Sequence, residues 1–145
     1  MNSKPSRNVA VALITLVAAF LLAGCSQGNV FSLEPGDCFS ASPSGELANV
    51  EIVGCNEPHT YEVYATFNLS GSVWPGTYTV DSLADDGCFA RFKSFVGISY
   101  ENSEWYISSL VPTKDSWEQL DDREIVCLIK PNFGTVAGSA RGTRR

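Results

Sequence analysis

The stretch YEVYATFNL, residues 61–69, alternates apolar and polar side chains more regularly than any other part of the chain. Successive side chains of a β-strand point to opposite faces of a sheet, so this alternation predicts a half-buried strand. Residues 71–77, with Trp74 next to a Pro-Gly pair, then predict a loop. The apolar side chains expected to share one face of the strand are Tyr61, Val63, Ala65, Phe67 and Leu69.

The segment after this loop begins at Thr79 or Asp81, ends at Val96 and carries apolar residues at spacings of three and four. This spacing predicts an amphipathic helix, which Gly97 is expected to stop. Gly87 lies inside the helix and should weaken it by about 1 kcal/mol relative to alanine. The apolar residues of the helix are Val80, Leu83, Ala84, Cys88, Phe92, Phe95 and Val96.

Shorter runs rich in β-branched and aromatic residues predict the remaining strands. They are centred on residues 38–39, 50–53, 104–111 and 124–130. A polar stretch, residues 112–123, is expected to connect the last two strands. We therefore predict an α+β domain over residues 33–140, in which a small antiparallel sheet carries one amphipathic helix.

The first residues have the features of an export signal. Residues 1–8 contain Lys4 and Arg7 but no acid, and the fifteen residues 9–23 are apolar except for Thr15. A membrane-spanning helix needs about 20 apolar residues, so a signal peptide is favoured over a permanent transmembrane helix.

The sequence Leu22-Ala23-Gly24-Cys25 resembles the lipobox of bacterial lipoproteins, in which small residues precede a cysteine that accepts a diacylglyceryl group. We expect residues 1–24 to be removed as a signal peptide and Cys25 to be lipidated, with residues 25–32 as a tether. Two acyl chains anchor a protein stably, which places the domain on the extracytoplasmic face of the cell membrane. The alternative is an ordinary secretory signal with an incidental cysteine.

The charge balance argues against nucleic acid as a partner. The whole chain has a net charge of −6, and removal of Lys4 and Arg7 makes it −8. Binding a phosphate backbone requires a basic face. The basic residues that cluster are Arg141, Arg144 and Arg145, and we expect this tail, residues 141–145, to be solvated.

Four cysteines remain after Cys25, and an even number outside the cell predicts two disulfides. We favour Cys38–Cys55 with Cys88–Cys127, because each bond then joins neighbouring predicted elements. The other two pairings remain open. No pair has the C-x-x-C spacing of a zinc site and His59 is the single histidine, so we expect neither a metal nor a cofactor.

Several short motifs together resemble the septum formation domain, over roughly residues 33–140. The motifs are Gly36-Asp37-Cys38-Phe39, Cys55-Asn56-Glu57-Pro58-His59, Glu62-Val63-Tyr64-Ala65, Trp74-Pro75-Gly76, Cys88, and Trp117 ahead of Asp122-Arg123 and Cys127. The resemblance implies an exported or membrane-anchored protein with no established biochemical activity. One position departs from it, because Asp121 stands where the family pattern implies a glycine.

His59 is the obvious candidate for acid–base chemistry, with Glu57 and Glu62 close in sequence. No nucleophile motif accompanies it, so we expect no catalytic residue and interpret His59 as the brace of a turn. Trp74, in its Pro-Gly loop, is expected to be exposed and to contact a partner. Trp74 and His59 are thus the candidate binding residues.

These observations favour a non-catalytic binding module in the cell envelope that recognises another envelope protein or a cell-wall component. One alternative is a small envelope hydrolase that uses His59 with a nearby acid. Another is a carrier for a small lipid or metabolite, which would need an apolar cavity.

The lipobox predicts that the mature protein begins at an acylated Cys25. Mass spectrometry of the N-terminal peptide, isolated from membranes of the native host, should show a diacylglyceryl group on this residue. An unmodified Cys25, or residues 1–24 still attached in the membrane fraction, would contradict the prediction.

Overall fold

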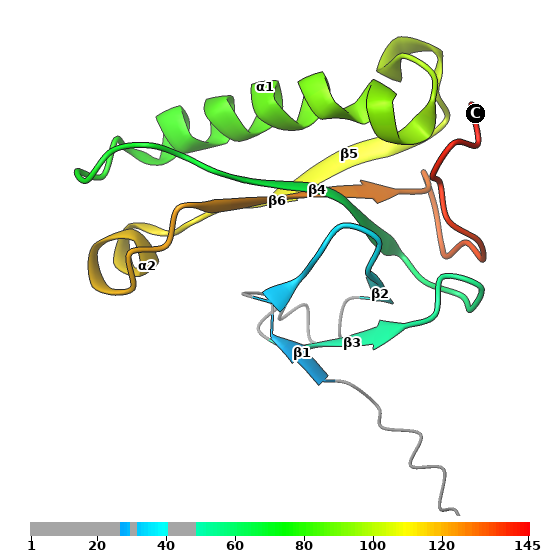
Figure 1. The fold of residues 1–145 in the computed structure, drawn as a ribbon, viewed down its shortest axis with the longest axis horizontal. Helices are drawn as coiled ribbons and strands as arrows, with labels where there is room; N and C mark the ends of the chain where they lie inside the picture. Colours follow the sequence, from blue (N-terminus) through cyan, green and yellow to red (C-terminus); the bar gives the residue numbers. More distant parts are fainter. Residues whose placement is uncertain (1–26, 30–31, 41–48) are drawn as a thin grey trace, which may run out of the picture.

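The computed structural model describes residues 27–29, 32–40 and 49–145, and these confirm the predicted α+β class. An antiparallel sheet has the strand order β1-β3-β2-β4-β6-β5, with helix α1 lying across it (Figure 1). The strands are β1 (Gln27–Asn29), β2 (Cys38–Ser40), β3 (Asn49–Val53), β4 (Tyr61–Asn68), β5 (Tyr106–Leu110) and β6 (Glu124–Lys130). The helices are α1 (Thr77–Val96), the 3-10 turn η2 (Tyr100–Asn102) and α2 (Lys114–Gln119).

The sheet buries apolar residues on both faces. On one face, α1 packs against β4, β6 and β5. The other face of β4 and β6 packs against residues of β2 and β3. This part of the sheet, formed by β1, β3 and β2, lies below β4 in Figure 1. The first core includes Val80, Ala84, Cys88, Phe92, Trp117, Ile125, Cys127 and Ile129. The second core consists of Leu33, Phe39, Val50, Val63, Val126 and Leu128.

The prediction that the apolar residues of β4 share one face is wrong, because the strand contains a bulge. Val63 pairs with Leu128 and Ala65 with Cys127, which leaves Tyr64 as an extra residue. A bulge inserts one residue and shifts the alternation of faces. Tyr61 and Val63 therefore lie in the second core, whereas Ala65, Phe67 and Leu69 lie against α1.

Tyr64 and a disulfide fix the middle of α1 to the sheet. The Tyr64 hydroxyl donates a hydrogen bond of 2.8 Å to the Cys88 carbonyl, and burial raises the pKa of this hydroxyl above its usual range. Cys88 is bonded to Cys127 of β6, and Cys38 to Cys55, as predicted. Each bond restricts the unfolded chain, which typically stabilises a fold by about 2–4 kcal/mol.

The helix ends as expected but begins earlier. Gly97 adopts a left-handed conformation with φ 88° and its N–H bonds to the Lys93 carbonyl, an arrangement that favours glycine. The first helical residue is Thr77, ahead of the predicted Thr79 or Asp81.

Two elements fall in segments predicted to be irregular. β1 pairs with β3 inside the expected tether, residues 25–32. Helix α2 begins at a capping box in which Thr113 and Ser116 each accept the other's backbone N–H. Neither segment has the apolar periodicity that marks longer elements.

The C-terminal tail, residues 141–145, is exposed as expected, but it also contacts the end of α1. The Arg144 N–H donates to the Val96 carbonyl at the end of α1. The guanidinium of Arg141 lies 4.4 Å from the Phe95 ring centroid. Cations are favourable at a helix C-terminus, and arginine stacks well on aromatic rings, so this segment closes that end of the fold.

The predicted signal peptide, residues 1–24, and the predicted lipidation site, Cys25, lie outside the described residues. Within the described part of the chain, neither α1 nor α2 combines the length and the apolar character that crossing a bilayer requires.

Gly87 has a packing role that its low helix propensity hides. A Cβ atom built on Gly87 would overlap the ring of Phe67 on β4. The Arg91 guanidinium covers the same ring, 4.1 Å from its centroid. The helix can lie this close to β4 because residue 87 has no side chain.

We predict that Gly87→Ala lowers the free energy of unfolding by about 1 kcal/mol or more, because overpacking costs about 1–3 kcal/mol and outweighs the gain in helix propensity. Urea denaturation should measure the change. In a Phe67→Leu background, which removes the clashing ring atoms, the same substitution should be neutral or stabilising. Equal effects in both backgrounds would disprove this explanation.

Candidate functional site

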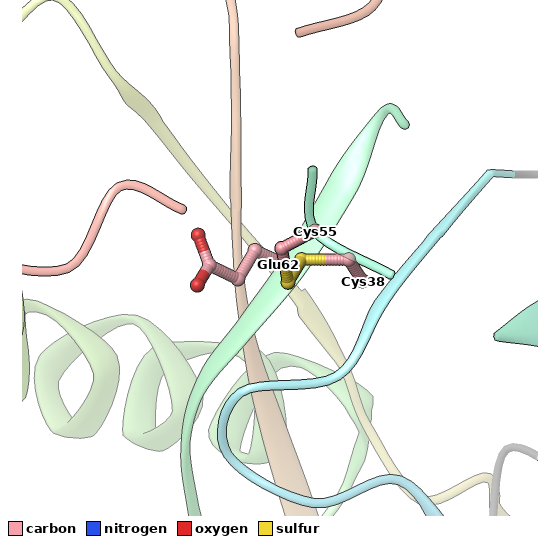
Figure 2. A group of neighbouring side chains, drawn as sticks. All are labelled: Cys38, Cys55 and Glu62. Carbon is pink, nitrogen blue, oxygen red and sulfur yellow. A yellow bond between two sulfur atoms is a disulfide. The ribbon is translucent and has the colours of Figure 1, made fainter. Parts of the chain in front are cut away.

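One cluster has the composition of a metal site but not its chemistry. Potential ligand atoms of Cys38, Cys55 and Glu62 lie within 4.8 Å of one another. Figure 2 shows that the two sulfur atoms are bonded to each other and that the Glu62 carboxylate points away from them. Disulfide sulfur lacks the thiolate charge that binds metals, so this cluster is structural.

Glu62 is buried, and the residues after β6 satisfy its carboxylate. One oxygen accepts a hydrogen bond from the Ser139 hydroxyl at 2.5 Å, and the other accepts from the Ala140 N–H at 2.7 Å. A buried carboxylate is costly unless it is hydrogen-bonded. Glu62 therefore acts as an internal anchor for the C-terminal segment.

His59 serves the same segment through its backbone. Its N–H and carbonyl form a two-bond bridge with Val136, at 2.9 Å each. Its side chain is 1 % exposed, and Nδ1 lies 2.8 Å from the Glu57 carbonyl. A carbonyl can only accept, so Nδ1 carries the proton. This geometry agrees with the predicted turn brace.

Cys55, His59 and Glu62 thus each form hydrogen bonds with residues 136–140. The Gly138 N–H donates to the Cys55 carbonyl at 2.6 Å, next to the contacts of His59 and Glu62. His59 and Glu62 bond to different groups and do not form an acid–base pair with each other. The segment that they hold gave no signal in the sequence, because, apart from the Ser139 hydroxyl, it bonds through its own backbone atoms.

Trp74 is less exposed than predicted. It is partly buried, and its ring packs edge-to-face on Trp117 with 5.5 Å between centroids. Trp117 is 1 % exposed, and its indole N–H donates to the Ser72 carbonyl at 3.3 Å. The loop after β4 and helix α2 are joined by this pair of tryptophans.

Arg123 supports the pair from the other side. Its guanidinium lies 3.8 Å from the Trp117 ring centroid and donates to the carbonyls of Gly71, Trp117 and Asp122. Asp121, which replaces the expected glycine, keeps a left-handed φ of 54° and pairs with Arg123 at 2.9 Å. Aspartate tolerates this conformation better than most residues, so the turn survives the replacement.

Two exposed apolar side chains are close in sequence to the tryptophan pair. Val73 precedes Trp74 and is 81 % exposed, and Leu120 caps α2 and is 67 % exposed. We call the surface formed by Val73, Trp74 and Leu120, with the buried ring of Trp117 behind Trp74, the tryptophan end. The exposed acids of α2 and the following turn are Asp115, Glu118 and Asp121. Burial and the charge of Asp122 raise the pKa of the adjacent Glu124.

A shallow pocket lies at the opposite end of the sheet. It has a volume of about 350 Å³, and its lining includes Trp105, Phe133 and Arg145. Arg145 pairs with Glu104 at 3.2 Å and covers the Trp105 ring. Most of the lining residues are solvent-exposed, so a lipid bound here would remain largely in water. This pocket does not provide the enclosed apolar cavity that a carrier needs.

Comparison with known proteins gives one match. A family model described as "Septum formation" matches residues 21–127, which is well over half of the chain. Searches against curated proteins and against solved structures found no significant match. The matched range contains the cysteines of both disulfides together with His59, Trp74 and Trp117. The chain therefore belongs to the septum formation family.

Proposed function

We propose that this protein is a non-catalytic binding module, held by a lipidated Cys25 on the extracytoplasmic face of the cell membrane. Membership of the septum formation family connects the chain with the cell envelope and with division. The observation that carries the proposal is the tryptophan end, where apolar side chains remain in water on a rigidly supported surface.

The support beneath the tryptophan end favours binding over flexibility. Trp117 is fixed by Arg123 and by the Ser72 carbonyl, and Trp74 rests on it. Aromatic anchors contribute most to protein interfaces when they are pre-organised in this way. Val73 and Leu120 would then be covered by the partner.

The charge around this surface indicates what kind of partner it suits. Asp115 and Glu118 are exposed on α2, while Lys114 is the single base of that helix. Opposite charges steer association and suppress wrong partners. We therefore propose that the tryptophan end recognises a basic surface of another envelope protein.

The hydrolase alternative has less support. A general base must reach the proton that it removes, but His59 is buried and its Nδ1 is bonded to a backbone carbonyl.

We predict that Val73→Ser and Leu120→Ser weaken capture of an envelope partner by about 1–2 kcal/mol together, because both side chains lose their apolar contact. Crosslinking in living cells, with mass spectrometry of the captured protein, identifies the partner, and binding of the purified pair measures the change. Trp74→Ala should weaken partner capture further.

The matched control is Phe133→Ser, which removes a side chain that is 85 % exposed at the other end of the sheet. Equal losses for the control and the test variants would contradict the proposal.

We predict that His59→Gln lowers the free energy of unfolding by about 1–3 kcal/mol, since it disturbs a buried hydrogen bond. Glu57→Gln, on an exposed side chain, should leave stability nearly unchanged. Both variants should show the same lack of turnover on purified peptidoglycan and ester substrates. A hydrolytic activity that disappears in folded His59→Gln would establish the enzyme and overturn the proposal.

A further inference from the structure

β5 is an open edge of the sheet. It pairs with β6 through five consecutive residues, and it is the last strand in the order β1-β3-β2-β4-β6-β5. Within residues 27–29, 32–40 and 49–145, no strand pairs with its outer side. Its sequence, YISSL, has no proline, charge or bulge, which are the usual devices that block edge pairing. β5 can therefore accept a further strand.

The sequence of β5 complements itself when two copies run antiparallel. A two-fold axis through Ser108, perpendicular to the sheet, places Tyr106 of each copy opposite Leu110 of the other and pairs all five residues. Tyr106 and Leu110 share one face of the strand, and Tyr106 is 43 % exposed, so this pairing removes apolar surface from water. An axis through the next residue would pair Tyr106 with Pro112, which has no N–H for the ladder.

The flank of α1 on the side of β5 carries charges of both signs. A Cβ atom on Gly87 would meet Phe67, so that flank of the helix faces β4. Phe89 is two residues further on and therefore about 200° around the helix, on the opposite flank. Residues four apart are neighbours on a helix face, so the exposed side chains of Asp85, Phe89 and Lys93 form one row there.

Phe89 lies level with the middle of β5. Its neighbour Cys88 is bonded to Cys127 of β6, and Cys127 pairs with Ser109. The axis through Ser108 is one strand residue away from this level, or about 3.3 Å. The axis therefore passes close to the middle of the row on α1.

This position of the axis brings opposite charges together. Lys93 lies about 6 Å from Phe89 toward the end of the helix, and Asp85 lies about 6 Å toward its start, because a helix rises 1.5 Å per residue. A two-fold axis near Phe89 reverses the order of the row in the second copy. Lys93 of each copy then lies level with Asp85 of the other.

The spacing of the two helices suits contact between these side chains. α1 packs against β4, β6 and β5, so its axis lies roughly above β6. Two copies joined through β5 have their β6 strands three spacings apart, or about 14 Å. A helix with its side chains is about 10–12 Å wide. The remaining gap of a few Å is within reach of the Phe89 ring and of the long Lys93 side chain.

We propose that β5 and the row on α1 bind a second copy of this chain and form a two-fold symmetric dimer. The two sheets continue into each other through β5, and the pair of Asp85 with Lys93 forms twice, because a two-fold interface uses the same patch on both subunits. Each copy carries a net charge of −6, but charges separated by more than about 8 Å are largely screened at physiological ionic strength. The charges that meet at the interface are complementary.

The dimer is independent of the proposed recognition of an envelope partner, because it uses a different surface. Substitutions at the tryptophan end should leave the association of the two copies unchanged. Substitutions in the row on α1 should leave partner capture unchanged. Each proposal can therefore fail while the other stands.

Charge reversal, measured by sedimentation equilibrium of the purified full chain, tests the inference. Asp85→Lys leaves only bases in the row and Lys93→Asp leaves only acids, so each variant should associate with itself about tenfold or more weakly than the unchanged chain. An equal mixture of the two variants should associate about as well as the unchanged chain, because each row then meets a row of opposite charge. The matched control is Glu51→Lys, which changes the net charge equally but lies on β3, four strand spacings from β5.

A single added cysteine tests the register. Ser108 lies on the axis, so Ser108→Cys places two thiols directly opposite each other, with Cβ atoms about 4.5–5.5 Å apart. Mild oxidation should link the copies through this residue. Tyr106→Cys is the control on the same face: its two thiols would be four residues apart along the strands, about 13 Å, although Tyr106 is the more exposed of the two positions.

Three results would overturn the inference. The first is a chain that sediments as a monomer at every concentration reached. The second is a mixture of Asp85→Lys and Lys93→Asp that associates no better than either variant alone. The third is a Tyr106→Cys variant that is linked as readily as Ser108→Cys.

Discussion

The structure depends on one strand that must contribute to two hydrophobic cores on opposite faces of the sheet. A regular β4 would send Val63 and Ala65 to the same face, and one of the cores would lose its contacts. The bulge at Tyr64 removes this conflict, because the first half of β4 faces the β2–β3 layer and the second half faces α1. The same irregularity directs the Tyr64 hydroxyl to the Cys88 carbonyl, so the bulge also fixes where α1 lies.

The elements that were predictable are those whose stability comes from local pattern. The helix 77–96, with its stop at Gly97, and the strand 124–130 have strong periodicity or β-branched content, and the disulfides follow from pairing adjacent elements. What could not be predicted depends on tertiary contacts. The bulge at Tyr64 does not change the composition of its strand. β1 is held by backbone pairing, which leaves no pattern of side chains in the sequence. Asp121 shows the same limit, since its left-handed conformation is supported by Arg123.

The motif that carries the family resemblance turns out to organise the fold. Cys55, His59 and Glu62 each bind the segment 136–140 through groups that are buried or belong to the backbone. The expected turn brace at His59 agrees with its buried side chain and its backbone bridge to Val136. The surface proposed for binding depends on residues that the topology brings together, such as Trp74 and Trp117, and such proximity has no signature in a single sequence.

The proposed lipid anchor acts at one edge of the sheet. Cys25 lies two residues before β1, so lipidation would hold one edge of the sheet at the membrane. The opposite edge is β5, five strand spacings of about 4.8 Å away along the sheet, or roughly 24 Å if the sheet were flat. Anionic headgroups repel an acidic domain, so they favour orientations in which the rest of the sheet is turned away from the membrane. If Cys25 is lipidated as we propose, a tether that starts directly at β1 keeps β1 next to the membrane and places β5 farthest from it along the sheet.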